Sequence, residues 1–97
     1  MVVSYSGKHM DVSDEMKDYL EKKLKKIKFY FEQIINITVI VEQERGKFNA
    51  EVKVAANQDT YFAKENSGTW QESFDKVVDK IEKEIKKKKE KLKDHHK

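Results

Sequence analysis

The sequence predicts an α+β domain with the order β-α-β-β-β-α, in which a four-stranded mixed sheet carries both helices on one face. Three observations support this prediction. Apolar residues recur at helical spacing near each end of the chain, they alternate with polar residues along the segments between, and turn-forming residues separate those segments. A parallel first pair of strands joined through a helix, an antiparallel meander and a closing helix give this layered arrangement. Because 97 residues can build one core, we expect a single domain over 1–97.

The first strand and the first helix are expected within the first 30 residues. The segment 2–6 has β-type composition, and Gly7 turns the chain toward the helix start. Asp11 or Ser13 can cap the free amides there, and acidic residues in the first turn complement the helix dipole. The helix should run to about residue 30, and its predicted buried stripe contains Val12, Met16, Leu20, Leu24, Ile27 and Phe31.

Three strands should then follow one another as a meander, because apolar and polar residues alternate in each. Turns are predicted at 44–47 and 57–59, and a longer loop at 66–69. The inward-facing residues are expected to be Ile35, Ile37, Val39 and Val41 in the first of these strands, Phe48, Ala50, Val52, Val54 and Ala56 in the second, and Tyr61 and Ala63 in the third.

The last helix should begin near Trp70, capped by Ser67 or Thr69, and reach about residue 93. Such a helix is about 36 Å long, whereas an eight-residue strand spans only about 27 Å, so its last turns should extend beyond the sheet. We therefore expect a basic helical extension at about 86–97. The apolar stripe of this helix is predicted to contain Phe74, Val77, Val78, Ile81, Ile85 and Leu92.

Positive charge is concentrated at the C-terminal end. The segment 76–97 holds ten lysines and five acidic residues, although the net charge of the whole chain is only +3. Spacings of four, three and four residues place Lys76, Lys80, Lys83 and Lys87 on one ridge of the last helix, opposite the apolar stripe. Lys22, Lys25 and Lys26 form a second basic face on the first helix, so the two faces are expected to make one groove that suits a polyphosphate backbone.

A plainer interpretation of the same lysines stays open. A solvated helix face can be stabilised by local pairs such as Asp79 with Lys83 and Glu82 with Lys86, each contributing about 0.2–0.5 kcal/mol. The aromatic residues Trp70 and Phe74 and the cluster Phe29-Tyr30-Phe31 could stack on bases. Core packing is the expected role of Phe74 and Phe31, and the role of Phe29 stays open.

Several classes of protein are not indicated by the sequence. There is no cysteine, no signal-peptide pattern and no apolar run long enough to span a membrane, which favours a cytoplasmic protein. No nucleophile elbow, glycine-rich phosphate loop or HExxH spacing is present, so no enzyme, cofactor or small-molecule substrate is expected. His9 has no partner at catalytic spacing, and His95 and His96 are interpreted as tail residues, so no metal site is expected.

The chain resembles the family of ribosome hibernation promoting factors and ribosome-associated inhibitors along its full length. The segments that carry the resemblance are the opening strand with Gly7, DVSDEMKDYLEKKLKKIKFYF, INITVIVE and FDKVVDKIEKEIKKKKEKLKDH. The resemblance implies a β-α-β-β-β-α fold that binds the small ribosomal subunit in the channel used by mRNA and by A- and P-site tRNA. It also implies that translation is silenced in stress or stationary phase. The short type within the family is the closest match.

The resemblance further implies which residues contact rRNA, since the family uses basic residues of both helices. It assigns Lys23 and Lys26 on the first helix and Lys80, Lys83, Lys87, Lys89 and Lys91 on the second. The helical wheel alone adds Lys22, Lys25, Lys76 and Lys86. The expected partners are therefore the small subunit with its rRNA and the whole ribosome.

Two other functions remain open from the sequence. The overhanging last helix could bind an acidic protein or a second copy of the chain. The domain could also bind RNA duplexes in general, but such modules place lysines at the start of the last helix, where this chain has Gln71, Glu72 and Asp75.

Overall fold

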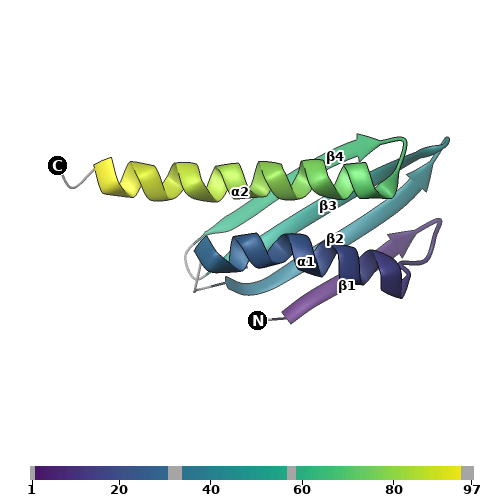
Figure 1. Cartoon of the computed structure of the whole chain (residues 1–97), viewed down its shortest axis with the longest axis horizontal. Coiled ribbons are helices and arrows are strands. Elements are labelled where there is room, and N and C mark those ends of the chain that lie inside the picture. The colour runs from purple at the N-terminus through teal and green to yellow at the C-terminus, as the bar shows by residue number, and fades with distance from the viewer. Residues whose placement is uncertain (1, 31–33, 57–58, 95–97) are drawn as a thin grey trace.

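The computed structural model describes residues 2–30, 34–56 and 59–94, and it has the predicted order of elements. The elements are β1 (Val2–Lys8), α1 (Asp14–Tyr30), β2 (Ile34–Glu44), β3 (Lys47–Ala56), β4 (Thr60–Ser67) and α2 (Trp70–Asp94). Figure 1 shows the strands side by side behind the two helices.

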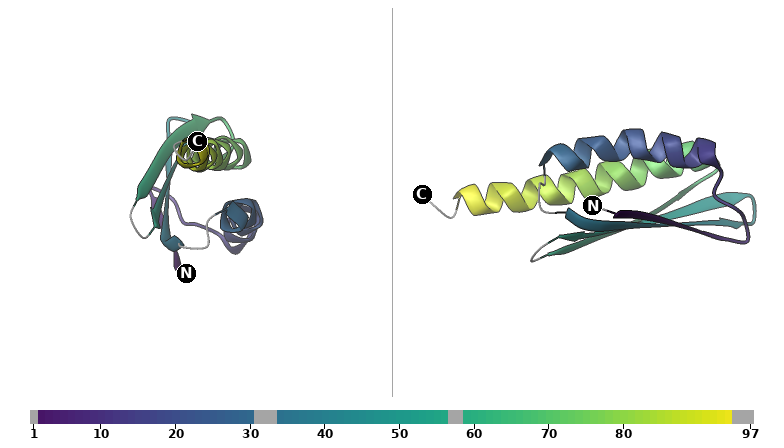
Figure 2. Two further views of the ribbon diagram at one scale, coloured as in Figure 1. Left: turned by 90° about the vertical axis from the view of Figure 1, so that its left-hand side faces the viewer. Right: turned by 90° about the horizontal axis from the view of Figure 1, so that it is seen from below.

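The sheet has the spatial order β1-β2-β3-β4, which is also the order along the chain. β1 pairs with β2 in parallel, and the β2–β3 and β3–β4 pairs are antiparallel. Both helices lie on one face of this sheet, as the two views of Figure 2 show, and no element of the described residues covers the other face. The predicted fold class is therefore confirmed.

The core lies between the sheet and the two helices. The predicted stripe of α1 is buried at Met16, Leu20, Leu24 and Ile27, whereas Val12 is half-buried. The predicted stripe of α2 is buried from Phe74 to Ile85. Phe31 and the turn residues 57–58 lie outside the described residues, and so does the side chain of Leu92. The sheet contributes Ile34, Ile37, Val39, Val41, Ala50, Val52, Val54, Ala56, Tyr61 and Ala63.

Side-chain caps begin both helices at predicted positions. The Met16 amide donates to the Ser13 hydroxyl oxygen at 3.2 Å, and the Glu72 amide donates to the Thr69 hydroxyl oxygen at 3.2 Å. Ser73, the one buried polar residue among those described, lies with its hydroxyl 2.7 Å from the Phe48 carbonyl oxygen. Because Phe48 is in β3, this hydrogen bond fixes the start of α2 on the sheet.

The β2–β3 hairpin turns at Arg45 and Gly46, within the predicted segment 44–47. Their φ angles are 50° and 76°, so both lie in the left-handed region that two-residue hairpin turns require. At Gly7 the constraint is different, because a Cβ there would collide with the backbone carbonyl oxygen of Met10. A side chain at position 7 would therefore displace the connection into α1.

Two local predictions were wrong. Ile35 was expected on the inward face, but it is 55% exposed and Ile34 is buried instead. The register shifts between Ile34 and Asn36, so a β-bulge inserts one extra residue and resets the alternation. The loop expected at 66–69 is shorter than predicted, because β4 continues to Ser67 and pairs it with Phe48.

Tyr5 on β1 is expected to ionise only at high pH. Its hydroxyl donates to the Glu21 carboxylate at 3.2 Å, and burial, followed by the charge of Glu21, raises the pKa of Tyr5 to about 12. Since the pKa of Tyr5 is higher in the folded than in the unfolded chain, the protonated phenol contributes to the free energy of unfolding. This contribution is complete below the ordinary pKa of 10.0 and is lost as the pH rises toward 12. In an alkaline absorbance titration, Tyr5→Phe should remove a late phase; an unchanged titration would contradict the assignment.

Candidate nucleic-acid interface

The outer side of α2 carries a row of exposed lysines, which we call the α2 ridge: Lys76, Lys80, Lys83 and Lys87. The buried stripe on the opposite side, from Phe74 to Ile85, holds the helix on the core and fixes the direction of the ridge. Figure 1 shows α2 continuing beyond the edge of the sheet, so the ridge runs from the sheet toward the free end of the helix. The side chains of Lys89 and Lys91, also predicted as contacts, lie outside the described residues.

Most α2 lysines near the ridge have acidic neighbours. Three pairs follow the helix at a spacing of four: Lys76 with Glu72 at 3.6 Å, Lys83 with Asp79 at 3.3 Å, and Lys86 with Glu82 at 3.1 Å. The last two are the local pairs that the plainer interpretation predicted. The first two pairs are exposed, so each contributes little and can exchange for a phosphate, whereas Glu82 in the third pair is largely covered.

Lys80 pairs across to the sheet instead. Its ammonium is 3.8 Å from a carboxylate oxygen of Glu65 on β4. A hollow of about 380 Å³ lies along this side of α2, lined by Glu65, Lys76, Asp79, Lys80 and Lys83. The α2 ridge therefore faces outward and toward β4, and Lys76 at its start also lines the hollow between the helices.

The lysines of α1 divide into two kinds. Lys22 and Lys25 are exposed, and within the described part of the chain neither takes part in an ion pair. Lys23 is half-buried and its ammonium lies 3.1 Å from Asp75 on α2. The side chain of Lys26 lies outside the described residues.

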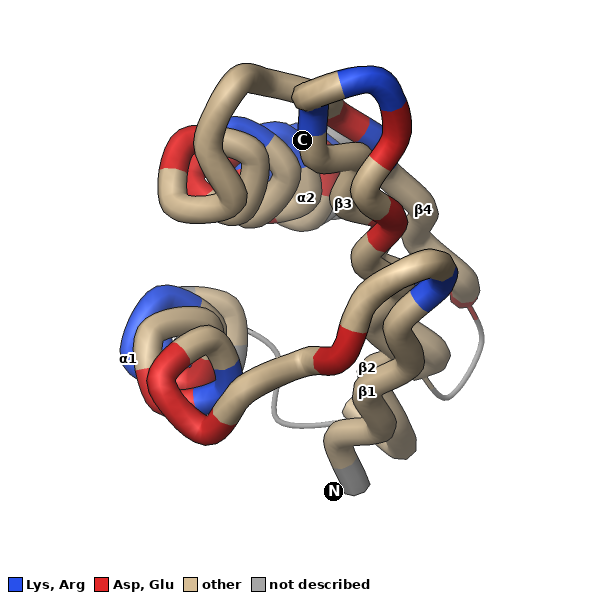
Figure 3. Tube along the Cα trace, turned by 90° about the vertical axis from the view of Figure 1, so that its right-hand side faces the viewer, with Lys and Arg blue, Asp and Glu red and all other residues tan. Residues whose placement is uncertain are grey.

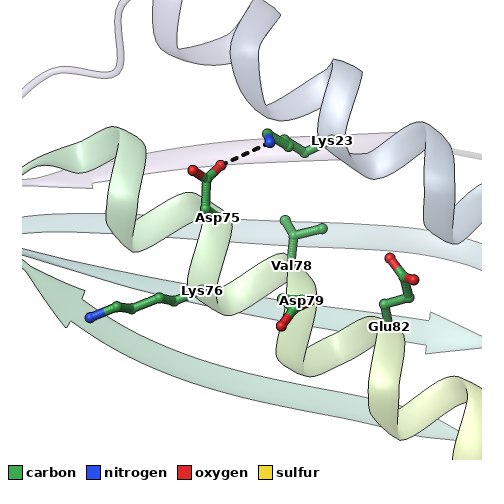
Figure 4. A pocket seen from close by; sticks show the side chains of 6 residues that line it. All are labelled: Lys23, Asp75, Lys76, Val78, Asp79 and Glu82. Carbon is green, nitrogen blue, oxygen red and sulfur yellow. Dashed lines mark ion pairs between the residues drawn. The ribbon is translucent and has the colours of Figure 1, made fainter.

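The hollow between the two helices is not the basic groove that the sequence predicted. It measures about 370 Å³ and is lined by Lys23, Asp75, Lys76, Val78, Asp79 and Glu82 (Figure 4). Asp75, Asp79 and Glu82 follow one another along α2 at spacings of four and three, and Asp79 also lines the hollow toward β4. Figure 3 shows both signs of charge on each helix. Lys23 and Lys76 thus share the lining of this hollow with three acidic residues, whereas Lys80 and Lys83 line the hollow toward β4.

Two pKa shifts accompany the contact between the helices. The hydrogen bond to Asp75 is the largest cause that raises the pKa of Lys23, and the same carboxylate raises the pKa of Tyr19. Near the start of α2, a hydrogen bond with Ser67 and the charge of Lys76 lower the pKa of Glu72. Each of these groups keeps its ordinary charge near neutral pH, so the surface has a fixed charge pattern there.

Sequence reasoning missed Glu65 and Asp75. Neither lies near a lysine partner along the chain, because Glu65 is on β4 and Asp75 meets residues of α1. The aromatic residues at the start of α2 are used in packing. Phe74 is fully buried, and Trp70 lies between Phe74 and Tyr19 with ring centroids 5.6 and 5.4 Å apart.

Other kinds of site find little support among the described residues. Within residues 2–30, 34–56 and 59–94, no group of three or more His, Cys, Asp or Glu side chains could hold a metal ion. His95 and His96 lie outside these ranges. None of the described helices is apolar over a length sufficient to cross a membrane.

Comparison with known families gives a match over nearly the whole chain. The family described as "Sigma 54 modulation protein / S30EA ribosomal protein" matches residues 3–93. A protein of Pseudomonas putida named ribosome hibernation promoting factor is 29% identical over 91 residues, which cover 94% of this chain and 89% of the relative. A ribosome hibernation promotion factor of Rhizobium meliloti is 31% identical over 98 residues, but the match covers only 52% of that longer protein.

A solved structure confirms the fold independently. A ribosomal subunit interface protein from Coxiella burnetii superposes with a TM-score of 0.83 and 24% sequence identity, covering 92% of this chain and 98% of the other. At this identity the likeness concerns the arrangement of strands and helices.

Proposed function

This chain belongs to the Sigma 54 modulation protein / S30EA ribosomal protein family, and we propose that it is a hibernation factor that binds small-subunit rRNA and inhibits translation. The family is non-enzymatic, in agreement with a sequence that predicted no catalytic residues. Relatives named ribosome hibernation promoting factor support the proposal. The single observation that carries the binding mode is the α2 ridge, a row of exposed lysines on a helix anchored by its opposite side.

The proposed contact surface consists of the exposed lysines on the two helices. On α2 these are Lys76, Lys80, Lys83 and Lys87, and on α1 they are Lys22 and Lys25. We add Lys26, Lys86, Lys89 and Lys91 from the resemblance and the helical spacing. Neutralising phosphates with these side chains releases counterions, so the affinity should fall steeply as salt increases.

We further propose that the protein occupies the channel for mRNA and for A- and P-site tRNA, in the cytoplasm, under stress or in stationary phase. The resemblance supports this location, and the shape is compatible with it. The molecule is elongated, with extents of 49 × 23 × 19 Å, and its lysine-bearing helices lie along the long axis. A body of this shape in the channel would exclude mRNA and tRNA by occupying their space.

The test compares three binding partners for the purified protein. We expect co-sedimentation with purified small subunits and with whole ribosomes, and little with large subunits or with a ribosome-free lysate. Equal binding to the large subunit, or capture of a protein from the lysate without ribosomes, would favour a protein-interaction module. Tight binding to any RNA duplex would favour a general double-stranded RNA binder.

A further inference from the structure

Two side chains of α1 meet at one carboxylate oxygen of α2. The Tyr19 hydroxyl donates to Oδ1 of Asp75 at 2.8 Å, and the Lys23 ammonium lies 3.1 Å from the same oxygen. The ammonium also lies 5.5 Å from the centroid of the Tyr19 ring, within the range of a cation–π interaction. Figure 4 shows Lys23 reaching from α1 across the hollow to Asp75 on α2.

Packing holds this cluster in place. The Tyr19 ring meets Trp70 edge to face, with centroids 5.4 Å apart and planes at 88°, and Trp70 in turn packs on the buried Phe74. Tyr19 can therefore present its hydroxyl to Asp75 in only a few orientations. A network whose members restrain one another is worth more than its separate pairs.

Lys23 takes part in an ion pair between the helices, unlike its neighbour Lys22. Lys22 is exposed, and it forms no ion pair within the described residues. Lys23 points along the surface to Asp75, and the hydrogen bond to that carboxylate raises its pKa. A phosphate that approached the Lys23 ammonium would also approach the Asp75 carboxylate, whose oxygen lies 3.1 Å from that ammonium and would repel the phosphate.

We propose that Tyr19, Lys23 and Asp75 form an interhelical lock that aligns the lysines of α1 with the α2 ridge for binding to RNA. Lys23 then acts by neutralising Asp75 and contacts no phosphate, and Asp75 is a positioning residue. The inference rests on the proposed function, because alignment matters only if both helices bind one polyanion. Because the two helices are already held at a fixed spacing, less conformational entropy is lost when their lysines bind RNA.

The dependence of affinity on salt separates a phosphate contact from a positioning residue. Each phosphate contact that is removed should lower the slope of log K against log salt by about 0.7–0.9. Lys22→Met, the matched control on the same helix, should lower the slope for small-subunit binding by about this amount. Lys23→Met should leave the slope unchanged while weakening binding at every salt concentration. A slope lowered by Lys23→Met as much as by Lys22→Met would overturn the proposal.

Asp75→Ala provides a test by the sign of the effect. Removing a negative charge from a surface that binds a polyanion should strengthen binding if electrostatics alone decides. The lock predicts the opposite, several-fold weaker binding, with circular dichroism confirming that the variant is folded. Tighter binding by folded Asp75→Ala would overturn the proposal.

A charge-swapped double variant covers the case in which Asp75→Ala does not fold. Lys23→Glu with Asp75→Lys keeps the net charge and restores an ion pair between the helices. Because it has the same net charge as the unaltered protein, we expect it to bind small subunits about as tightly as that protein, and binding as weak as that of Lys23→Met would contradict the lock. Failure of the proposed function looks different, because the unaltered protein would then not bind small subunits at all.

Discussion

Replacing Lys80, Lys83 and Lys87 together by Glu is expected to abolish co-sedimentation with small ribosomal subunits at moderate salt. Each substitution lowers the net charge by two units, so the net charge of the α2 ridge is six units more negative in the triple variant. Where the unaltered protein presents three ammonium groups to the phosphates, the variant presents three carboxylates. The fold should survive, because all three side chains are exposed and like-charge neighbours on a helix cost only about 0.2–0.5 kcal/mol each.

The matched control reverses three lysines that lie elsewhere. Lys8, Lys47 and Lys53 belong to strands β1 and β3 and are exposed, so their replacement by Glu produces the same net charge without touching either helix. Co-sedimentation of this control should largely persist. If both triple variants lose binding equally, net charge governs the interaction and the α2 ridge has no special role. If both still bind, the proposed surface is wrong.

Phe74→Ala is expected to lower the free energy of unfolding by about 3–5 kcal/mol. Phe74 is the largest of the fully buried side chains among the described residues, and its ring packs on Trp70, one turn earlier in α2. Removing its ring takes away apolar burial and leaves a cavity that the regular strands beneath can fill only in part. Because α2 carries the ridge, the same variant should also bind small subunits more weakly near its lowered melting temperature.

Chemical denaturation measures this change, and the chain offers a matched control. Phe62 on β4 is 53% exposed, so Phe62→Ala should change the free energy of unfolding by no more than about 0.5 kcal/mol. Similar losses for the two variants would mean that the packing between α2 and the sheet does not dominate the core.

Periodicity predicted the secondary structure well because burial here follows the ordinary repeats. The helical stripe from Phe74 to Ile85 and the alternation from Ile37 to Val41 both end up inside. The bulge at Ile34 was missed because both Ile34 and Ile35 are apolar, so composition alone does not say which one turns inward. The register with β3 decides it, and register depends on the partner strand.

Prediction of the site was less complete, for a related reason. A helical wheel shows that lysines lie opposite the apolar stripe, and it predicted the exposed positions of the α2 ridge. It does not show which side of that face meets another helix. Asp75, Asp79 and Glu82 turned out to line the hollow toward α1, and Asp75 meets Tyr19 from 56 positions away in the chain. Contacts at such separations arise from tertiary packing, which a local pattern does not encode.

Lysine acetylation footprinting on the small subunit tests the central claim most directly. The protein is labelled free and bound, and the reactivity of each lysine is read by mass spectrometry. We predict protection of Lys80, Lys83 and Lys87 on α2 and of Lys22 and Lys25 on α1, with unchanged reactivity at Lys47 and Lys53 on the sheet. Protection of the sheet lysines together with full reactivity along the α2 ridge would contradict the account.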